Sequence, residues 1–370
     1  MEDIKMVDMK AHYAKLKPEL DAAFSRVMES MQLVEGPQVQ SFARSLEQFL
    51  QVSHAFPCAT GIDAARIALA ALELPAGAEV VLPAFNDGAV AEVVLQLGLK
   101  PVFADVLSHT YTLDPVSVKQ VITPATAAIV PTHLFGQCAE MEELMQLAET
   151  HGLWVLEDNT QSFGAVYVGT DGREKRAGSI GHLSLTAFFP PKPLAGMGEG
   201  GAVFTSSKAL AGKIEKLLSG EKGNSFSKLE TLQAAMLEVK IKYIDEYNEA
   251  RQEVARFYDH AFAETPLVQA PQRSSNSSHT YHQYAITVPA HVRDGLKDHL
   301  WNNYIPSVIY YPQPLHLQEA FQELGYKPGD LPVAGQLSQS ILSLPMHSEL
   351  KQDQQAYICQ HVRDFVKQHG

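Results

Sequence analysis

The sequence predicts an α/β protein with two domains: a large domain with a mixed, mostly parallel sheet flanked by helices over residues 1–245, and a smaller C-terminal α/β domain over residues 246–370. The chain has 370 residues, above the size at which one hydrophobic core usually stops growing. Its composition, 45% hydrophobic and 19% charged, is typical of a globular protein. Between residues 59 and 205, short apolar runs alternate with helical stretches, which indicates a sheet covered on both faces.

The first 55 residues predict an N-terminal helical arm and one packed helix, both part of the large domain. Apolar residues recur at helical spacing in two groups, separated by the break at Gly36-Pro37. The groups are Leu16, Leu20, Phe24, Val27 and Met31, then Phe42, Leu46 and Leu50.

Six short apolar runs predict the strands of the large domain. Because ligands of such sheets bind at the carboxyl ends of the strands, the residues that end or follow these runs are the first candidates for a site. The runs are 79–83, 101–105, 128–131, 153–158, 183–186 and 201–205.

The C-terminal third begins with an amphipathic stretch over residues 229–263, long enough for one helix that bridges two domains. Residues 273–278 are a loop by composition. A strand over 284–288 and a helix over 294–301 then begin the smaller domain.

Charge and cysteine content argue against several classes of function. With 29 basic and 42 acidic residues, the net charge is −13, which leaves no basic surface for nucleic acid. No run approaches the ~18 apolar residues of a membrane span, and the N-terminus has no apolar signal segment. Cys58, Cys138 and Cys359 are too scattered for a disulfide framework or a zinc site. We expect a cytoplasmic protein without a metal.

A helix start near residue 60 is the first candidate binding element. Thr60 and Gly61 precede an apolar helical stretch that contains Ile62 and Ile67. Unpaired backbone N–H groups at such a start bind phosphate. A capped helix in any α/β protein has the same pattern, so a purely structural role stays open.

Asp158 is the second candidate, because it ends the apolar run 153–158. An acid at the carboxyl end of a strand lies where an open sheet binds ligands. An acid that caps the following helix is the structural alternative.

The segment 188–201 carries the sharpest chemical signal. Lys192 lies between two prolines, after Phe188 and Phe189 and before four glycines. Glycines let a backbone approach a ligand closely, and an amine desolvated by aromatic neighbours is able to form a Schiff base. A solvated loop lysine is the alternative.

Five motifs, in order and spacing, resemble those of the DegT/StrS family of sugar-nucleotide aminotransferases, which use pyridoxal phosphate on a type I aminotransferase fold. The resemblance runs from about residue 30 to the end of the sequence. The motifs are Thr60-Gly61-x-Asp63-Ala64, Glu157-Asp158-x-x-Gln161-Ser162-Phe163-Gly164-Ala165, Phe188-Phe189-Pro190-x-Lys192-Pro193-Leu194, Gly198-Glu199-Gly200-Gly201, and Tyr311-Pro312-x-Pro314-Leu315-His316 with Ser343-Leu344-Pro345-Met346.

The resemblance implies roles for individual residues. Lys192 would hold pyridoxal 5′-phosphate as an internal aldimine and move the proton between the substrate carbon and the cofactor. Asp158 would keep the pyridine nitrogen protonated, and Gln161 would hydrogen-bond the phenolic oxygen of the ring. Thr60 and Gly61 would lie at the phosphate.

The resemblance also implies the reaction and the assembly. Glutamate would give up its amino group and leave pyridoxamine 5′-phosphate, and the amine would then pass to a nucleoside-diphosphate keto-sugar. The amino sugar would serve a surface glycan such as lipopolysaccharide, or a natural product. Family members are homodimers whose sites borrow a loop from the other subunit, here residues 223–230.

Three cofactor contacts depart from the family pattern. Ile62 and Ala187 stand where the family has hydroxyl groups for the phosphate, and Asp87 stands where an aromatic residue stacks on the ring. Two lost hydrogen bonds to a charged group would weaken cofactor binding by about 3–6 kcal/mol. Backbone N–H groups, the covalent bond and Lys228 of the borrowed loop would offset this loss, and Phe85 is the alternative stacking residue.

Tyr310, Tyr311 and His316 resemble family residues that approach the substrate, although loop tyrosines and histidines are common without such a role. The departures leave two alternatives to a sugar aminotransferase: a non-catalytic or regulatory family member, or another pyridoxal phosphate reaction on the same fold. The retention of Lys192 with its matching acid, Asp158, favours catalysis.

Overall fold

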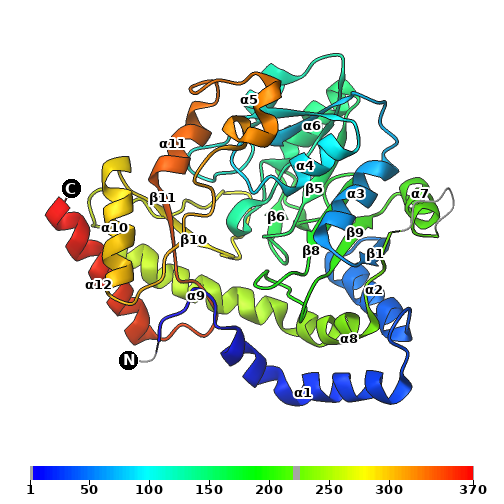
Figure 1. The fold of residues 1–370 in the computed structure, drawn as a ribbon, viewed down its shortest axis with the longest axis horizontal. Coiled ribbons are helices and arrows are strands. Elements are labelled where there is room, and N and C mark those ends of the chain that lie inside the picture. Colours follow the sequence, from blue (N-terminus) through cyan, green and yellow to red (C-terminus); the bar gives the residue numbers. More distant parts are fainter. Residues whose placement is uncertain (1–2, 220–225, 370) are drawn as a thin grey trace.

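A seven-stranded sheet organises the first two thirds of the chain in the computed structural model, which describes residues 3–219 and 226–369 (Figure 1). The strand order is β1-β9-β8-β5-β4-β2-β3, and β9 alone among these seven runs against its neighbours. The strands are β1 (His54–Cys58), β2 (Glu79–Pro83), β3 (Lys100–Ala104), β4 (Thr126–Ile129), β5 (Trp154–Asp158), β8 (Leu183–Ala187) and β9 (Gly201–Thr205).

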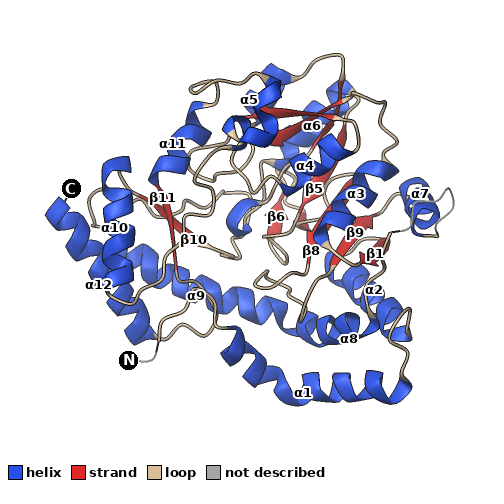
Figure 2. Cartoon of the chain, viewed as in Figure 1, coloured by secondary structure: helices blue, strands red, loops and turns tan. Residues whose placement is uncertain are grey.

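Helices cover both faces of this sheet because alternate residues of its strands point to opposite sides (Figure 2). In β2, Val80 and Leu82 belong to the core under α3, α4 and α7, whereas Val81 belongs to the core under α5 and α6. Double coverage explains the continuous apolar runs in the sequence. The helices are α2 (Pro37–Leu50), α3 (Gly61–Ala71), α4 (Ala89–Gln96), α5 (Pro115–Val121), α6 (Met141–His151) and α7 (Lys208–Leu218).

The expected single helix over 229–263 is interrupted. It consists of α8 (Thr231–Lys240), a 3-10 turn over Ile241–Tyr243 and α9 (Ile244–Phe262). The amphipathic pattern continues across the turn, so the break could not be predicted from it. The expected domain boundary at 245/246 falls in the first turn of α9, and the division into two domains stays a prediction.

The C-terminal elements form a second core with their own two-stranded sheet. This core includes buried residues of α9, α10, α12, β10 and β11, together with Ile4 from the N-terminus. Leu315, Phe321 and Leu337 instead belong to the core of the large sheet, which ties the C-terminal third to it. The elements are β10 (Tyr284–Thr287), α10 (Ala290–Asn302), 3-10 turns at Leu315–Leu317 and Glu319–Leu324, α11 (Pro332–Ser340), β11 (Ile341–Leu344) and α12 (Gln352–His369).

The first helix, α1 (Met9–Ser30), is a long arm beside α8, as Figure 1 shows. Its buried side chains pack against α8 and Tyr247. Several large apolar side chains of α1 and its C-cap stay exposed: Met9, Tyr13, Phe24, Met28 and Met31. The arm therefore offers apolar surface that residues 3–219 and 226–369 leave uncovered.

The predicted α/β class with a mostly parallel sheet is confirmed, and all six predicted strands are present. One strand was not predicted: residues 54–58 form edge strand β1, although the sequence pattern assigns its first two residues to the end of the helical segment. Pro57 fits this place because an edge strand tolerates a residue without an N–H. A short hairpin of β6 (Val166–Val168) and β7 (Glu174–Arg176) completes the strands. Within residues 3–219 and 226–369, no helix is both long and apolar enough to cross a bilayer.

Candidate active site

Asp158 lies at the carboxyl end of β5, as predicted, and its side chain is only 6% exposed. Its Oδ1 accepts a hydrogen bond from the Thr160 N–H (3.0 Å), and the Thr132 hydroxyl donates to Oδ2 (3.4 Å). Burial raises the pKa of Asp158 above its ordinary value, and the nearby charge of Asp87 raises it further. Hydrogen bonds from Thr160 and the charge of Lys192 act in the opposite direction with smaller effect. The carboxylate is therefore a buried group whose electrostatic environment includes the ammonium of Lys192.

The preceding acid, Glu157, has a different role because neighbouring residues of a strand point to opposite faces. Glu157 is fully buried and accepts hydrogen bonds from the backbone N–H groups of Gly178 (2.8 Å), Ile180 (2.6 Å) and Gly181 (2.5 Å). Its Oε2 lies 2.8 Å from Nε2 of His133. The Nδ1 of His133 accepts a hydrogen bond from the Ala139 N–H (3.1 Å). Glu157 and His133 thus fix the loops around the end of β5.

Lys192 lies in a loop whose shape is set by backbone hydrogen bonds. Its N–H donates to the Phe189 carbonyl (2.9 Å), and the Gly196 N–H returns to the Phe188 carbonyl (2.7 Å). Phe188 is buried against Phe42, with ring centroids 5.4 Å apart. Phe189 is 49% exposed, so the expectation that both aromatic rings desolvate the lysine was wrong.

His282 belongs to the segment 279–282, which the family resemblance places near the sugar-nucleotide channel, and it lies near Lys192. Its pKa is lowered well below the ordinary value, first by burial and then by the charges of Lys192 and Arg251. Histidines at the edge of a strand are common without a ligand, so the sequence left a structural role open, and the tertiary structure places this imidazole near the lysine.

The start of α3 forms a backbone site near the lysine loop. Thr60 caps the helix: its Oγ1 accepts from the Asp63 N–H and donates to the Asp63 carboxylate, both at 3.0 Å. Gly61 and Ile62 are the first helical residues, and their N–H groups have no acceptor within the helix. A Cβ on Gly61 would lie 2.5 Å from that of Ala187, so this close approach requires glycine.

The neighbouring hydroxyl residue, Thr186, does not replace the two hydroxyl groups that the sequence lacks. Ile62 is 42% exposed, and Ala187 is half-buried beside Gly61. The Thr186 side chain is buried, with its hydroxyl 3.5 Å from the Asn159 carbonyl, so it points away from the face that Ala187 presents. A phosphate at this position would depend on backbone N–H groups.

Gln161 is fixed at both ends of its amide. Its Oε1 accepts from the Phe135 N–H (3.1 Å), and its Nε2 donates to the Tyr311 hydroxyl (3.0 Å). Tyr311 packs in turn against Phe85 (ring centroids 5.2 Å apart) and stacks on Phe135 (5.9 Å). Because Phe85 is completely buried in this aromatic cluster, it does not replace the missing stacking residue. Asp87 is exposed, and its Oδ1 accepts from the N-terminal turn of α4.

The predicted substrate and borrowed-loop residues differ in their exposure. Tyr310 is 38% exposed next to the largely buried Tyr311, so it is accessible to a substrate. His316 is 1% exposed, and its ring lies against Tyr326 at 5.8 Å, so the structure does not place it at the substrate and that prediction is corrected. Lys228 is exposed and pairs with Glu35. Residues 223–225 of the predicted borrowed loop lie outside the described residues.

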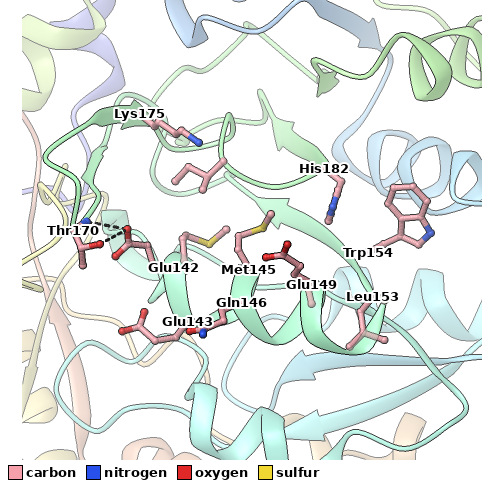
Figure 3. Close-up of a pocket in the computed structure, with 14 residues that line it drawn as sticks. Glu142, Glu143, Met145, Gln146, Glu149, Leu153, Trp154, Thr170, Lys175 and His182 are labelled. Atoms are coloured by element: carbon pink, nitrogen blue, oxygen red, sulfur yellow. Dashed lines mark hydrogen bonds between the residues drawn. The ribbon is translucent and has the colours of Figure 1, made fainter.

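A separate hollow lies over α6 and the β6–β7 hairpin (Figure 3). Trp154, at the start of β5, lines it, so it lies at the opposite end of that strand from Asp158. Glu142, Glu143 and Glu149 make its wall acidic, and Glu142 is occupied by hydrogen bonds from Thr170. None of the predicted site residues lines this hollow.

The residues present fit pyridoxal phosphate. The lysine loop offers an amine, Asp158 offers a buried carboxylate for a protonated ring nitrogen, and the start of α3 offers N–H groups for a phosphate. Fold and site together define an aminotransferase-type centre at the carboxyl edge of an α/β sheet.

The chain belongs to the DegT/DnrJ/EryC1/StrS aminotransferase family, whose family model matches residues 14–363. It is 36% identical to the pleiotropic regulatory protein of Geobacillus stearothermophilus, over 99% of both chains. It is 35% identical to the UDP-2-acetamido-2-deoxy-3-oxo-D-glucuronate aminotransferase of Pseudomonas aeruginosa, over 96% of this chain and 98% of that one.

Solved structures of related proteins have the same fold along nearly the whole chain. The S. venezuelae protein DesV, in complex with a ketimine intermediate, matches with a TM-score of 0.94 and 31% identity over 99% of each chain. NtdA of Bacillus subtilis, with bound cofactor PMP, matches with a TM-score of 0.87 and 26% identity over 95% of this chain and 82% of that one. The predicted family and the type I fold are therefore confirmed.

The raised pKa of Asp158 predicts that this carboxylate lowers the stability of the cofactor-free protein. The folded chain binds the proton more tightly than the unfolded chain, so stability falls as pH rises from the unfolded value of 3.8 through the raised pKa. Each pKa unit corresponds to about 1.4 kcal/mol. Thermal unfolding without cofactor should therefore give Asp158→Asn a higher Tm than the parent at pH 7, with the difference disappearing below about pH 4.

Asp171→Asn, in the exposed turn between β6 and β7, is the matched control and should leave Tm unchanged at both pH values. A parent protein more stable than Asp158→Asn at pH 7 would contradict the assignment of Asp158 as a costly buried charge.

Proposed function

We propose that this protein transfers the amino group of glutamate to a nucleotide-linked keto-sugar, with pyridoxal phosphate bound at Lys192. The observation that carries this proposal is the arrangement of Lys192 and the buried Asp158 around the start of α3. Family membership and the nucleotide-sugar aminotransferase among its relatives support the class of reaction and of substrate.

When bound, pyridoxal phosphate supplies a carbonyl group that accepts and releases the amine, and a ring that withdraws electrons. Lys192 Nζ would hold the group and then carry the proton removed from the substrate carbon. The Asp158 carboxylate would hold a proton on the ring nitrogen, and the positive charge there would stabilise the ionised acid in its buried place. Gln161, held by Phe135 and Tyr311, would fix the ring edge.

The phosphate would be bound mainly by backbone N–H groups at the start of α3. Gly61 and Ile62 supply these donors, and the helix dipole favours a negative charge at this end. Glycine at 61 lets the start of α3 approach Ala187 on β8. Positions 62 and 187, the two predicted phosphate contacts, therefore lie close together. The cofactor would therefore be held with fewer side-chain donors than the family pattern supplies.

The active unit would be a homodimer in the cytoplasm. Exposed apolar residues lie on α1 and beside the site, at Ile62, Phe189 and Met197. Large apolar side chains exposed around a site are typical of an interface with another protein. A second copy would cover them and complete the site with its 223–230 loop.

A regulatory role is the second candidate function. The pleiotropic regulatory protein of G. stearothermophilus, 36% identical over 99% of the chain, favours it, as do the missing hydroxyl groups at 62 and 187. The two candidates differ in one property, since only the aminotransferase exchanges amines with glutamate.

Lys192→Ala should abolish amine exchange between glutamate and isotope-labelled 2-oxoglutarate, because the group that moves the proton is lost. The rate of amine exchange should fall about 100-fold or more, as expected when an acid-base group is lost. Borohydride reduction of the parent followed by peptide mass spectrometry should locate the cofactor on Lys192.

Lys175→Ala, on the exposed hairpin strand β7, is the control and should exchange amines at the parent rate. Undiminished exchange by Lys192→Ala would remove the central assignment.

Restoring the two hydroxyl groups should strengthen cofactor binding. Ile62→Thr with Ala187→Ser adds two donors to the phosphate, and each hydrogen bond to a charged group is worth about 1.5–3 kcal/mol. Cofactor affinity in equilibrium dialysis should rise about 100-fold or more. Ile62→Val has the shape of threonine without its hydroxyl and should leave affinity unchanged; equal retention by both proteins would argue against a phosphate at this helix start.

A further inference from the structure

A pocket beside Lys192 has a feature that the proposed reaction does not yet explain. It lies between the first turns of α1, the junction of α8 and α9, and the segment that precedes α12. In Figure 1 the N-terminal segment passes close to that segment, and the Met346 N–H donates to the Met6 carbonyl (3.2 Å). The basic side chains that line the pocket are Lys192, Lys240, Arg251, His12, His282 and His347.

Lys240 is the unusual member of this set. It is only 6% exposed, and its Nζ donates to the Ala195 carbonyl (2.7 Å). Burial lowers the pKa of Lys240 to about 8 and that of Arg251 to about 10, and no neighbouring acid contributes to either shift. Arg251 donates to the Thr280 carbonyl (3.0 Å) and to the side chain of Asn248, which are neutral groups.

The two acids of the pocket do not neutralise these charges. Asp8 pairs with Lys5 (2.8 Å) and caps α1, and Glu349 pairs with Lys15 (2.9 Å). Across residues 3–219 and 226–369, Lys240 therefore has no carboxylate partner. A buried ammonium without a counter-ion costs free energy, which an anionic ligand would recover.

Two histidines add unpaired hydrogen-bonding groups to the same pocket. His347 is only 7% exposed, and neither of its ring nitrogens has a hydrogen-bond partner in the described part of the chain. Nε2 of His12 is also buried without such a partner. Burial lowers the pKa of His12 to about 4, so this ring is neutral at pH 7. Such rings add hydrogen bonding without a second full charge.

We infer that Lys240, His347 and His12 form a carboxylate subsite that anchors the substrate whose carbon reacts at Lys192. The inference rests on the proposed function and names the chemical group that the site recognises. The α-carboxyl carbon of an amino-acid donor lies only two bonds from the nitrogen that exchanges at Lys192, and Lys192 itself lines this pocket. The carboxylate of a uronic keto-sugar is the second source of the same chemistry.

The hydrogen bond to Ala195 offers a purely structural explanation for Lys240, and a matched pair of variants separates the two roles. Lys240→Gln keeps an N–H donor for the Ala195 carbonyl and removes the charge. Lys242→Gln removes the same charge two residues away, where the side chain is 59% exposed and pairs with Glu19.

Binding to the cofactor-free protein tests the subsite without catalysis. Glutarate, a dicarboxylate with no group to transfer, represents the donor, and UDP-glucuronate compared with UDP-glucose represents the sugar. Isothermal titration calorimetry should show that Lys240→Gln weakens glutarate binding at least tenfold, or removes the preference for UDP-glucuronate over UDP-glucose. The first result identifies the donor as the source of the carboxylate, and the second identifies the sugar.

Lys242→Gln should match the parent in both titrations. Equal binding of glutarate, and an equal preference between the two nucleotides, by the parent and Lys240→Gln would overturn the subsite even if glutamate exchanges its amine. A different result would separate the two proposals. If the parent never exchanges amines but Lys240→Gln still binds more weakly than the parent, the subsite stands and only the proposed function is refuted.

Discussion

The buried carboxylate of Asp158 is the constraint on which the site depends. A carboxylate this buried raises the free energy of the folded chain unless a positive group stabilises it, and the charge of Lys192 acts on it only partly. Glu157, its neighbour on β5, fixes three backbone N–H groups and His133 on the opposite face. One strand end thus provides a rigid frame on one face and an electrostatically unsatisfied group on the other. A cationic ring nitrogen is the partner that this group lacks.

Other groups around Lys192 also lack partners of opposite charge in the part of the chain that the structure describes. The start of α3 presents N–H groups without acceptors in the helix, and Lys240, in the pocket that Lys192 also lines, pairs with no carboxylate of residues 3–219 and 226–369. These groups favour ligands of opposite charge. A cation would stabilise Asp158, whereas anions would stabilise Lys240 and the helix start. A cofactor with a protonated ring and a phosphate, together with a carboxylate substrate, would meet all three. The loss of the hydroxyl groups at 62 and 187 weakens one of these contacts and leaves the other two intact.

Sequence reasoning succeeded where the signal is local. The bounds of β2 and β9 were predicted correctly, because each is an apolar run that ends at a turn, and Asp158 was placed at a strand end for the same reason. It failed where the tertiary structure decides. β1 contains Pro57 and lies at a sheet edge, and the turn at Ile241–Tyr243 interrupts a helical pattern that the sequence continues. The burial of His316 and Phe85, and the place of His282 and Lys240 beside Lys192, depend on segments distant in sequence.

The decisive measurement is the visible absorbance of the purified protein with and without added pyridoxal phosphate, and again after glutamate. A yellow band from cofactor bound to Lys192 is expected, and it should bleach when glutamate donates its amine. If no band forms at saturating cofactor, the protein does not bind pyridoxal phosphate at Lys192; Ile62, Ala187 and Asp87 would then have cost the chain its cofactor, and the fold would serve another purpose.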